Sequence, residues 1–220
     1  METVLDFVVR FAPIAIAAYL CGCFNGAIMI SHRILHDDVR EHGSGNAGLT
    51  NFYRNYGAHY AGLVIALDML KAVAAVVFAL VYLRMIGMPE FNLLGKYVAA
   101  LFCVIGHMFP VMYGFRGGKG ILCGGTLLIL SDWRVALVAW GLFILLLLAT
   151  RYVSLGSIAA AASFPVSTWL FIDRGWLMLT LSALTGGLII YGHRQNIVRL
   201  LSGTERKLAR HKKSAEGDGK

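Results

Sequence analysis

The sequence predicts an all-α polytopic membrane protein with seven transmembrane helices. Hydrophobic residues make up 58% of the 220 residues and charged residues only 15%, and the mean hydropathy is +0.68. Soluble domains carry about 25% charged residues. The chain also contains several apolar runs whose lengths approach the roughly 20 residues that an α-helix needs to cross a bilayer. The first run has no basic segment before it and no small-residue cleavage site after it, so we expect it to remain as a membrane span.

The predicted spans differ in strength along the chain. They are residues 5–30, 60–83, 94–113, 120–130, 135–150, 155–172 and 176–191. The second span contains Asp68 and Lys71, three residues apart in an apolar helix, which predicts a buried ion pair. The fourth span is the weakest because it is short and glycine-rich at its start. We expect it to begin inside a protein-lined cavity. The polar stretch "SDWR" (131–134) separates it from the fifth span.

The distribution of basic residues predicts the orientation. Most of the 20 Lys and Arg residues lie after the first, third and fifth spans and in the C-terminal segment. The opposite connections contain Arg84, Lys96, Arg134 and Arg174. The positive-inside rule therefore places the N-terminus outside and the C-terminus in the cytosol. We expect one membrane domain over residues 1–205 and a disordered basic tail over 206–220. The basic residues that give the net charge of +8 lie beside the spans. We therefore expect them to determine membrane orientation and to contact anionic ligands rather than nucleic acid.

The first polar segment on the predicted cytosolic face is "GSGNAGLTNFYR" (43–54). Its glycines allow the backbone to turn and approach a ligand closely. Arg54 adds a planar cationic fork suited to phosphate. The other candidate contacts from this segment are Ser44, Gly45, Asn46, Thr50 and Asn51. The alternative interpretation is an ordinary turn with a helix cap.

The second segment, "GHMFPVMYGFRGGKG" (106–120), is typical of an anion-binding loop. Its candidate residues are His107, Arg116, Gly117, Gly118 and Lys119. Paired glycines next to a lysine can hold oxyanions through backbone N–H groups and charge. It is not a nucleoside-triphosphate loop, because Tyr113 and Gly120 replace the required glycine and hydroxyl residue. A basic turn at the membrane edge is the alternative, and His107 alone is equally consistent with binding a backbone carbonyl.

Two further segments complete the predicted cytosolic face. "RYVSLGS" (151–157) contributes Ser154, and "GHRQNIVRLLSGTERK" (192–207) contributes His193, Asn196 and Glu205. His193 and Asn196 share one helical face, with Arg199 on an adjoining stripe.

Other catalytic patterns are weaker. No serine–histidine–acid triad and no metal-ligand cluster is readable, and the four cysteines fit buried apolar positions. We therefore expect no metal and no cofactor. His32 and Asp37 match an H-x4-D acyltransferase pattern, but so short a pattern often matches by chance.

With these segments in view, the chain resembles the bacterial acyl-phosphate:glycerol-3-phosphate acyltransferases, the PlsY family. The motifs that carry the resemblance are "GSGNAGLTNFYR" (43–54), "GHMFPVMYGFRGGKG" (106–120) and "HRQNIVRLLSGTERK" (193–207). The resemblance implies seven spans, an outside N-terminus and an active site at the cytosolic face of a bacterial inner or plasma membrane. It also implies transfer of a fatty acyl group from acyl-phosphate to the 1-hydroxyl of glycerol-3-phosphate. The products would be lysophosphatidic acid and phosphate, in the first step of phospholipid synthesis.

The resemblance also suggests roles for the candidate residues. Arg54, Lys119 and His193 are the predicted catalytic residues, and Arg54, Lys119 and Arg116 are expected to hold phosphates. The remaining candidates are expected to bind substrate. His193 or His107 could take the hydroxyl proton, but a substrate phosphate oxygen is favoured because the leaving group is good. A covalent acyl-enzyme on Cys or Ser is a third option.

Two other functions stay open at this point. Glycine-rich breaks and intramembrane charges also occur in transporters of phosphorylated solutes. An acyltransferase with another donor or acceptor is the second alternative. The expected partners are glycerol-3-phosphate, acyl-phosphate and membrane lipids. The enzyme that makes acyl-phosphate and the next acyltransferase are candidate handover partners.

Overall fold

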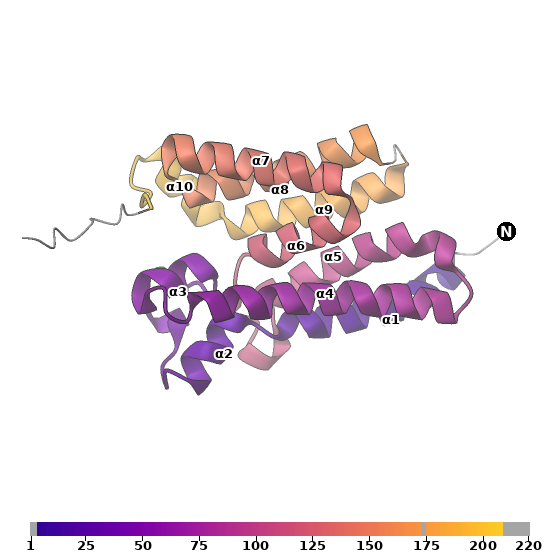
Figure 1. The fold of residues 1–220 in the computed structure, drawn as a ribbon, viewed down its shortest axis with the longest axis horizontal. Coiled ribbons are helices and arrows are strands. Elements are labelled where there is room, and N and C mark those ends of the chain that lie inside the picture. The colour runs from indigo at the N-terminus through magenta and orange to yellow at the C-terminus, as the bar shows by residue number, and fades with distance from the viewer. Residues whose placement is uncertain (1–3, 173–174, 209–220) are drawn as a thin grey trace, which may run out of the picture.

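The computed structural model describes residues 4–172 and 175–208, which form α-helices joined by turns and short 3-10 segments (Figure 1). The α-helices are α1 (Val4–Cys23), α2 (Gly26–Arg33), α3 (Leu49–Tyr56), α4 (Ala61–Met85), α5 (Asn92–Met108), α6 (Ile121–Ser131), α7 (Trp133–Thr150), α8 (Val153–Phe171), α9 (Trp176–Gly192) and α10 (Arg194–Leu201). The 3-10 segments are Val39–Glu41, Pro89–Phe91 and Val111–Tyr113. The all-helical prediction is confirmed for these residues.

The number of possible membrane spans is smaller than the seven expected. Within the described residues, four helical segments are long and apolar enough to cross a bilayer, namely α4, α5 with its flanking turns, α7 and α8. The number rises to six if the bent pairs α1–α2 and α9–α10 each form one span. The helix expected to be weakest, α6, has 11 residues. At 1.5 Å per residue it covers about 16 Å, roughly half of a bilayer's hydrocarbon core.

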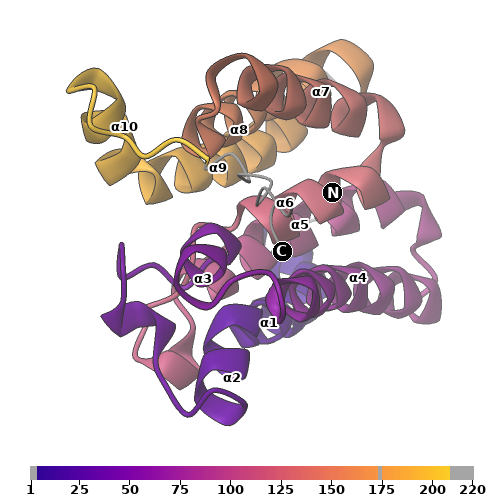
Figure 2. The same ribbon diagram turned by 60° about the vertical axis from the view of Figure 1, so that its left-hand side comes forward.

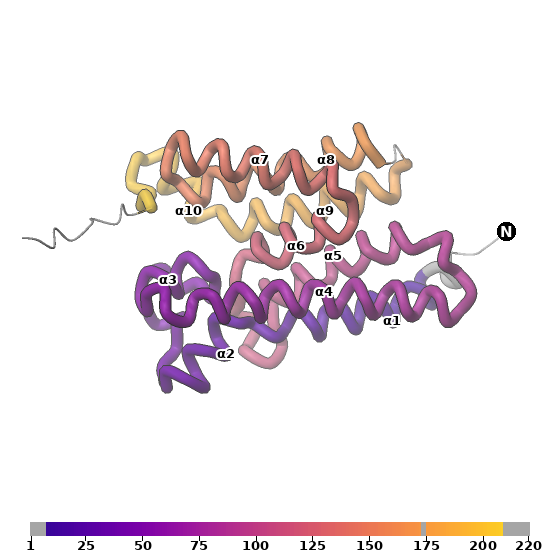
Figure 3. Tube along the Cα trace, in the orientation of Figure 1, coloured from indigo at the N-terminus to yellow at the C-terminus, as the bar shows by residue number. Residues whose placement is uncertain are grey.

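The helices form two groups with α6 between them (Figure 2). One group contains α1, α4 and α5, which pack on one another, and the other contains α7, α8 and α9. Helix α6 contacts α4, α5 and α7, and α5 also contacts α9. The path of the chain in Figure 3 shows that α2, α3 and α10 lie at the same end of the bundle, opposite the turn between α4 and α5. The polar segments identified in the sequence therefore meet at one end.

The first predicted span is interrupted, which the sequence analysis missed. Helices α1 and α2 meet at an angle of 40° across Phe24 and Asn25. Asn25 starts the second helix because its side-chain oxygen accepts a hydrogen bond from the N–H of Ile28 at 3.0 Å. Backbone groups freed at such a break need partners inside the protein.

Those partners come from the ion pair in α4. Lys71 Nζ lies 2.8 Å from Asp68 Oδ1, so the predicted buried pair is confirmed. Lys71 also donates to the carbonyl oxygens of Gly22 and Phe24, at 3.3 and 3.0 Å. Asp68 Oδ1 accepts from the N–H of Gly26 at 3.2 Å. The two buried charges thus complete the hydrogen bonds of the α1–α2 break.

The C-terminal boundary is also later than expected. Residues 206–208 belong to the folded part, since the N–H of Leu208 donates to the carbonyl of Arg151 at 2.8 Å and Arg54 donates to the carbonyl of Arg206 at 3.1 Å. Most of the predicted tail, residues 209–220, lies outside the described residues.

Helices α1 and α5 approach each other through glycines. A Cβ atom on Gly106 would lie 2.1 Å from the carbonyl oxygen of Tyr19, and one on Gly22 would lie 2.2 Å from that of Cys103. Small residues allow such close helix contacts in membrane proteins. The crossing places His107, the residue after Gly106, near the C-terminal end of α5.

We expect Gly106→Ala to destabilise the protein by about 1–3 kcal/mol, because the added methyl group must push α1 and α5 apart. The matched control is Gly141→Ala in α7, where a Cβ atom meets open space. That change should be neutral or stabilise the helix by up to about 1 kcal/mol. Thermal unfolding of the detergent-solubilised variants measures both effects, and equal melting temperatures would contradict the proposed tight crossing.

Candidate active site

A cavity of about 450 Å³ opens where the polar segments meet. Its size is within the usual range for a small-ligand site. Of the candidate residues from the sequence, those that line it are Ser44, Asn46, Thr50, Asn51, Arg54, His107, Lys119, Ser154, His193, Asn196 and Glu205. Gly45, Arg116, Gly117 and Gly118 are not among the lining residues. The structure therefore brings together most of the predicted set, from all four polar segments of the chain.

The segment of residues 43–54 is organised by Asn51. Its side-chain amide donates to the carbonyls of Val39 and His42, both at 3.0 Å, and its oxygen accepts from the N–H of Ser44 at 2.9 Å. Gly43 has a φ of +60°, and a Cβ atom there would lie 2.5 Å from the Asn51 oxygen. Asn51 therefore shapes the loop that presents Ser44 to the cavity, and its polar atoms are already engaged.

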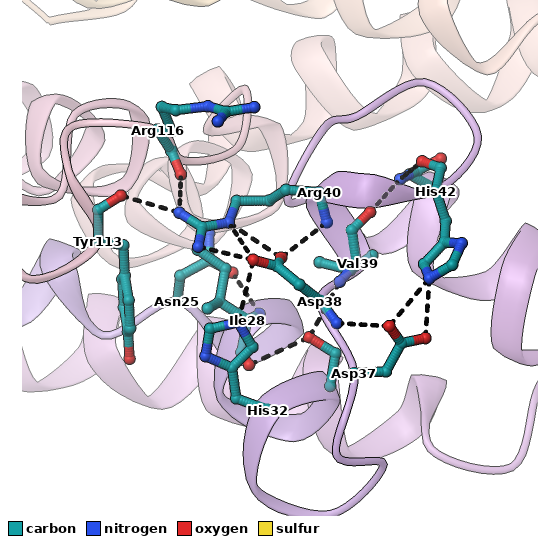
Figure 4. Close-up of polar contacts among 12 residues, drawn as sticks. Asn25, Ile28, His32, Asp37, Asp38, Val39, Arg40, His42, Tyr113 and Arg116 are labelled. Atoms are coloured by element: carbon teal, nitrogen blue, oxygen red, sulfur yellow. Dashed lines mark hydrogen bonds and ion pairs between the residues drawn. The ribbon is translucent and has the colours of Figure 1, made fainter.

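Arg40 joins this segment to the second one (Figure 4). Its guanidinium contacts the Asp38 carboxylate at 2.8 Å and donates to the carbonyls of Tyr113 and Arg116, at 2.8 and 3.4 Å. The backbone of Arg116 is thereby turned toward Arg40, while its side chain is exposed outside the cavity. The expected position of Arg116 at the phosphates is not observed. The positions of these residues in the sequence gave no indication that Arg40 holds this turn in place.

The anion turn, defined as residues 116–120, differs from the expected phosphate loop. The N–H groups of Gly117 and Gly118 donate to the carbonyls of Met108 and His107, at 3.1 and 3.0 Å. They are therefore engaged within the protein. A Cβ atom on Gly117 would lie 2.0 Å from the His107 carbonyl oxygen, and one on Gly118 would lie 2.2 Å from His107 Nε2. These glycines permit close packing on His107.

Lys119 is the charged residue that this turn places in the cavity. It donates to the side-chain oxygen of Asn196 on α10. Burial, reinforced by the positive charge of Arg199, lowers the pKa of Lys119 to about 8. The ammonium is thus poorly solvated and would be stabilised by a bound anion.

Glu205 connects α8, α10 and the C-terminal segment. Its carboxylate accepts hydrogen bonds from Ser154, Asn196 and Arg199, each at 2.8 Å. Burial raises the pKa of Glu205, but these hydrogen bonds outweigh burial and lower the pKa overall. Glu205 therefore orients Asn196, which in turn holds Lys119.

Two charged lining residues were missed as site residues. Arg199 lines the cavity together with Asp68. Arg199 lies on the stripe next to His193 and Asn196, so its helical position was a usable signal. Asp68 was assigned only to the ion pair. It lies outside the four polar segments, so its sequence position gave no indication that it lines the cavity.

The histidines of the chain have different surroundings. His193 Nδ1 lies 2.8 Å from the carbonyl oxygen of Ile189, which can only accept, so Nδ1 carries the proton and Nε2 has the lone pair. His32 contacts Asp38 at 3.1 Å, whereas Asp37 contacts His42. The His32 and Asp37 pattern is therefore not a catalytic pair, and neither residue lines the cavity.

The cavity lining also includes apolar residues of α4, α6 and α7, which we call the apolar arm; two of them, Met69 and Ile129, are 38% and 51% exposed. Trp140 and Phe143 of α7 form part of its wall. At the polar end, a smaller cavity of about 190 Å³ shares Arg54, Arg199 and Glu205 with the main one and adds Arg206. The site thus combines a group of cationic residues, Arg54, Lys119 and Arg199, which we call the cationic mouth, with the apolar arm.

Comparison with known proteins supports one family. Residues 12–203 match the family model for glycerol-3-phosphate acyltransferase. The chain is 37% identical over 199 residues to the glycerol-3-phosphate acyltransferase of Clostridioides difficile, covering 90% of this chain and 96% of that protein. It is 38% identical over 194 residues to the enzyme of the same name from Thermoanaerobacter sp., covering 88% and 93%.

Two solved structures share the fold. One is the crystal structure of PlsY, an integral membrane glycerol 3-phosphate acyltransferase, in its glycerol 3-phosphate form. Its TM-score is 0.79 at 33% identity, with 90% of this chain and 96% of that chain covered. The other is the lysophosphatidic acid form of PlsY, with a TM-score of 0.76 at 33% identity and coverage of 90% and 95%. A multi-pass membrane protein is therefore the shared architecture.

We expect Glu205→Gln to lower stability at neutral pH by about 1–3 kcal/mol, because charge-assisted hydrogen bonds are lost. Since the folded-state pKa of Glu205 is lowered, this stabilisation is fully present above the unfolded pKa of about 4.3 and is lost as the pH falls through the folded value. The difference in melting temperature between wild type and variant should therefore shrink in acid. Glu90→Gln, at an exposed position, is the control. A pH-independent difference would contradict this role.

Proposed function

The chain belongs to the glycerol-3-phosphate acyltransferase family, and we propose that it transfers a fatty acyl group from acyl-phosphate to the 1-hydroxyl of glycerol-3-phosphate. The hydroxyl oxygen attacks the acyl carbonyl carbon, and the bond from that carbon to the phosphate oxygen breaks. The phosphate leaves with the bonding electrons. The products are lysophosphatidic acid and inorganic phosphate.

The observation that supports this proposal is the continuity of a cationic mouth with an apolar arm in one cavity. An acyl-phosphate has the same division, since its phosphate is charged and its chain is apolar. Glycerol-3-phosphate brings a second phosphate to the same reaction. A site that holds both anions close together removes much of the entropic barrier between two reactants.

We assign the phosphate contacts to Arg54 and Lys119, with Arg199 taking the place expected for Arg116. Arg54 and Arg199 line both cavities, while Lys119 lies deeper, in the main one. The first turn of α6 follows directly, and Gly120 and Ile121 line the main cavity. A helix N-terminus favours anions, so this turn adds to the attraction.

For the proton of the 1-hydroxyl, we favour acceptance by a substrate phosphate oxygen. The leaving phosphate is a good leaving group, so a strong protein base is not needed. His193 lines the cavity with Asn196 and Lys119, and the lone pair on its Nε2 is suited to accept a hydrogen bond from the hydroxyl. His193 would then orient the nucleophile. Ser44, Asn46 and Thr50 supply further polar contacts.

The proposal includes a membrane orientation and partners. The seven-span topology, with α6 counted as the short fourth span, places α3 and α10 at the cytosolic face of the bacterial inner or plasma membrane. The cytosolic face suits a water-soluble phosphorylated acceptor, and the apolar arm suits a donor that resides in the lipid. Direct handover from the enzyme that makes acyl-phosphate and to the next acyltransferase would be consistent with this arrangement.

The test compares donors. Purified protein in detergent or vesicles is given glycerol-3-phosphate with acyl-phosphate, acyl-CoA or acyl-carrier protein, and lysophosphatidic acid and phosphate are measured. We expect product from acyl-phosphate, and phosphate release that requires glycerol-3-phosphate. Product from another donor alone would overturn the donor assignment. Uptake of a phosphorylated solute into vesicles without any product would favour transport.

The lowered pKa of Lys119 predicts the pH dependence of substrate binding. The ammonium loses its proton as the pH rises through about 8, while a phosphate monoester, whose second pKa is about 6, is already fully charged above neutral pH. The KM for glycerol-3-phosphate should therefore rise roughly tenfold between pH 7 and pH 9.

Lys119→Arg is the matched variant for this prediction, because a guanidinium stays charged over the whole range. Its KM should be flat from pH 7 to pH 9, even if its turnover is lower. Initial rates corrected for spontaneous hydrolysis of the donor give both profiles. The assignment fails if wild type is flat, or if the variant rises in parallel with it.

A further inference from the structure

Lys71 lies outside the cavity lining but contacts a residue that belongs to it. Its side chain is 3% exposed, and its ammonium lies 2.6 Å from His107 Nδ1 and 2.8 Å from Asp68 Oδ1. The carbonyl oxygens of Gly22 and Phe24 complete its surroundings. His107 and Asp68 both line the main cavity. A buried charge therefore sits one contact behind the proposed substrate site.

These contacts decide which nitrogen of His107 carries the proton. The carboxylate of Asp68 and the two carbonyl oxygens can only accept, so they require Lys71 as a donor. An ammonium has three N–H groups and no lone pair, so it can only donate, and one of its N–H groups is shared between two of the four neighbouring acceptor atoms. The Nδ1 atom of His107 must therefore present its lone pair to Lys71. A neutral Lys71 could accept from Nδ1, but it would leave the buried charge of Asp68 without its partner, which is costly.

The single proton of a neutral His107 is consequently on Nε2. That atom packs against Gly118, where a Cβ atom would lie only 2.2 Å away, and the ring forms part of the cavity wall. The Nε2–H group is thus presented beside the anion turn, one residue from Lys119. His193 has the opposite arrangement, because its Nδ1 donates to Ile189 and its Nε2 keeps the lone pair.

We propose that Lys71 is a positioning residue that fixes His107 as a neutral N–H donor toward a substrate oxyanion. In this arrangement His107 cannot act as the base through Nε2, since that atom already carries the proton. A fixed donor needs no reorganisation when negative charge develops, which is the condition for effective electrostatic stabilisation. The nature of the oxyanion, a phosphate or acyl carbonyl oxygen, rests on the proposed function, whereas the tautomer does not.

The tautomer can be measured directly by 15N NMR of histidine-labelled protein, because protonated and unprotonated ring nitrogens resonate far apart. His107→Gln removes one set of signals and so assigns His107. We expect an unprotonated Nδ1 and a protonated Nε2 in the wild type. In Lys71→Met, Nδ1 loses its donor and the signals should shift toward the other tautomer or a mixture. A wild-type His107 with Nδ1–H would overturn the proposal, whatever the enzyme transfers.

Measurements of kcat/KM then distinguish a positioning role of Lys71 from a purely structural one. We expect Lys71→Met to lower kcat/KM by on the order of 100-fold, as for loss of an oxyanion donor. Gln can place its amide N–H near the position of Nε2 and has no tautomer to fix. His107→Gln should therefore keep part of the activity, and adding Lys71→Met to it should lower activity much less than Lys71→Met does in the wild type, the remaining loss reflecting the missing contacts at the α1–α2 break. An equal loss in both backgrounds would show that Lys71 acts only by closing the α1–α2 break.

Two control variants test the assignment of Lys71 as a positioning residue. The double variant Asp68→Asn with Lys71→Met removes both buried charges. It therefore tests the loss of the Lys71 donor without leaving the Asp68 carboxylate unpaired. It should show the same NMR shift and the same loss of activity as Lys71→Met alone. A double variant that keeps wild-type kcat/KM would overturn the proposal. Lys96→Met, at the opposite end of α5, controls for removal of a lysine charge. If wild type forms no lysophosphatidic acid from any donor, the proposed function fails, and the NMR result still decides the tautomer.

Discussion

A helix that breaks within a membrane protein must find partners for its freed backbone groups inside the protein, and the rest of this structure depends on how that is done at Phe24 and Asn25. The carbonyls and N–H group at the break are bonded by Lys71 and Asp68 of α4. This fixes α4 against both α1 and α2. Asn25, which starts α2, also donates to the carbonyl of Ala47, so the break holds the 43–54 loop as well. One local irregularity therefore sets the positions of two walls of the cavity.

The sequence predicted features that have few physical alternatives. Charges three residues apart in an apolar helix almost have to pair, as Asp68 and Lys71 do. Polar segments after alternate spans must meet at one end of a bundle. The break in the first span was missed because apolar residues continue on both sides of Phe24 and Asn25. The positions of Arg116 and the N–H groups of Gly117 and Gly118 were missed because spacing does not reveal where a backbone turn points its groups.

The candidate site is held together by a network of hydrogen bonds within the protein. Glu205 lies among Arg54, Lys119, Arg199 and Arg206 and balances part of their charge. It also links the two groups of helices, because the segment that carries it contacts Arg54 on one side and Arg151 on the other. The remaining positive charge is held in place by hydrogen bonds rather than by flexible surface side chains. Such a site can receive anions with little rearrangement.

The partly exposed Met69 and Ile129 have a consequence for how the two proposed reactants arrive. Both residues also line the cavity, so under the proposed function an acyl donor dissolved in the lipid would reach the apolar arm by diffusing within the membrane, while glycerol-3-phosphate would arrive from water. The relevant quantity for the first is its mole fraction in the membrane, not its bulk molarity. Adding inert lipid or detergent at constant total donor would thus slow the protein by surface dilution alone, with every contact in the site unchanged.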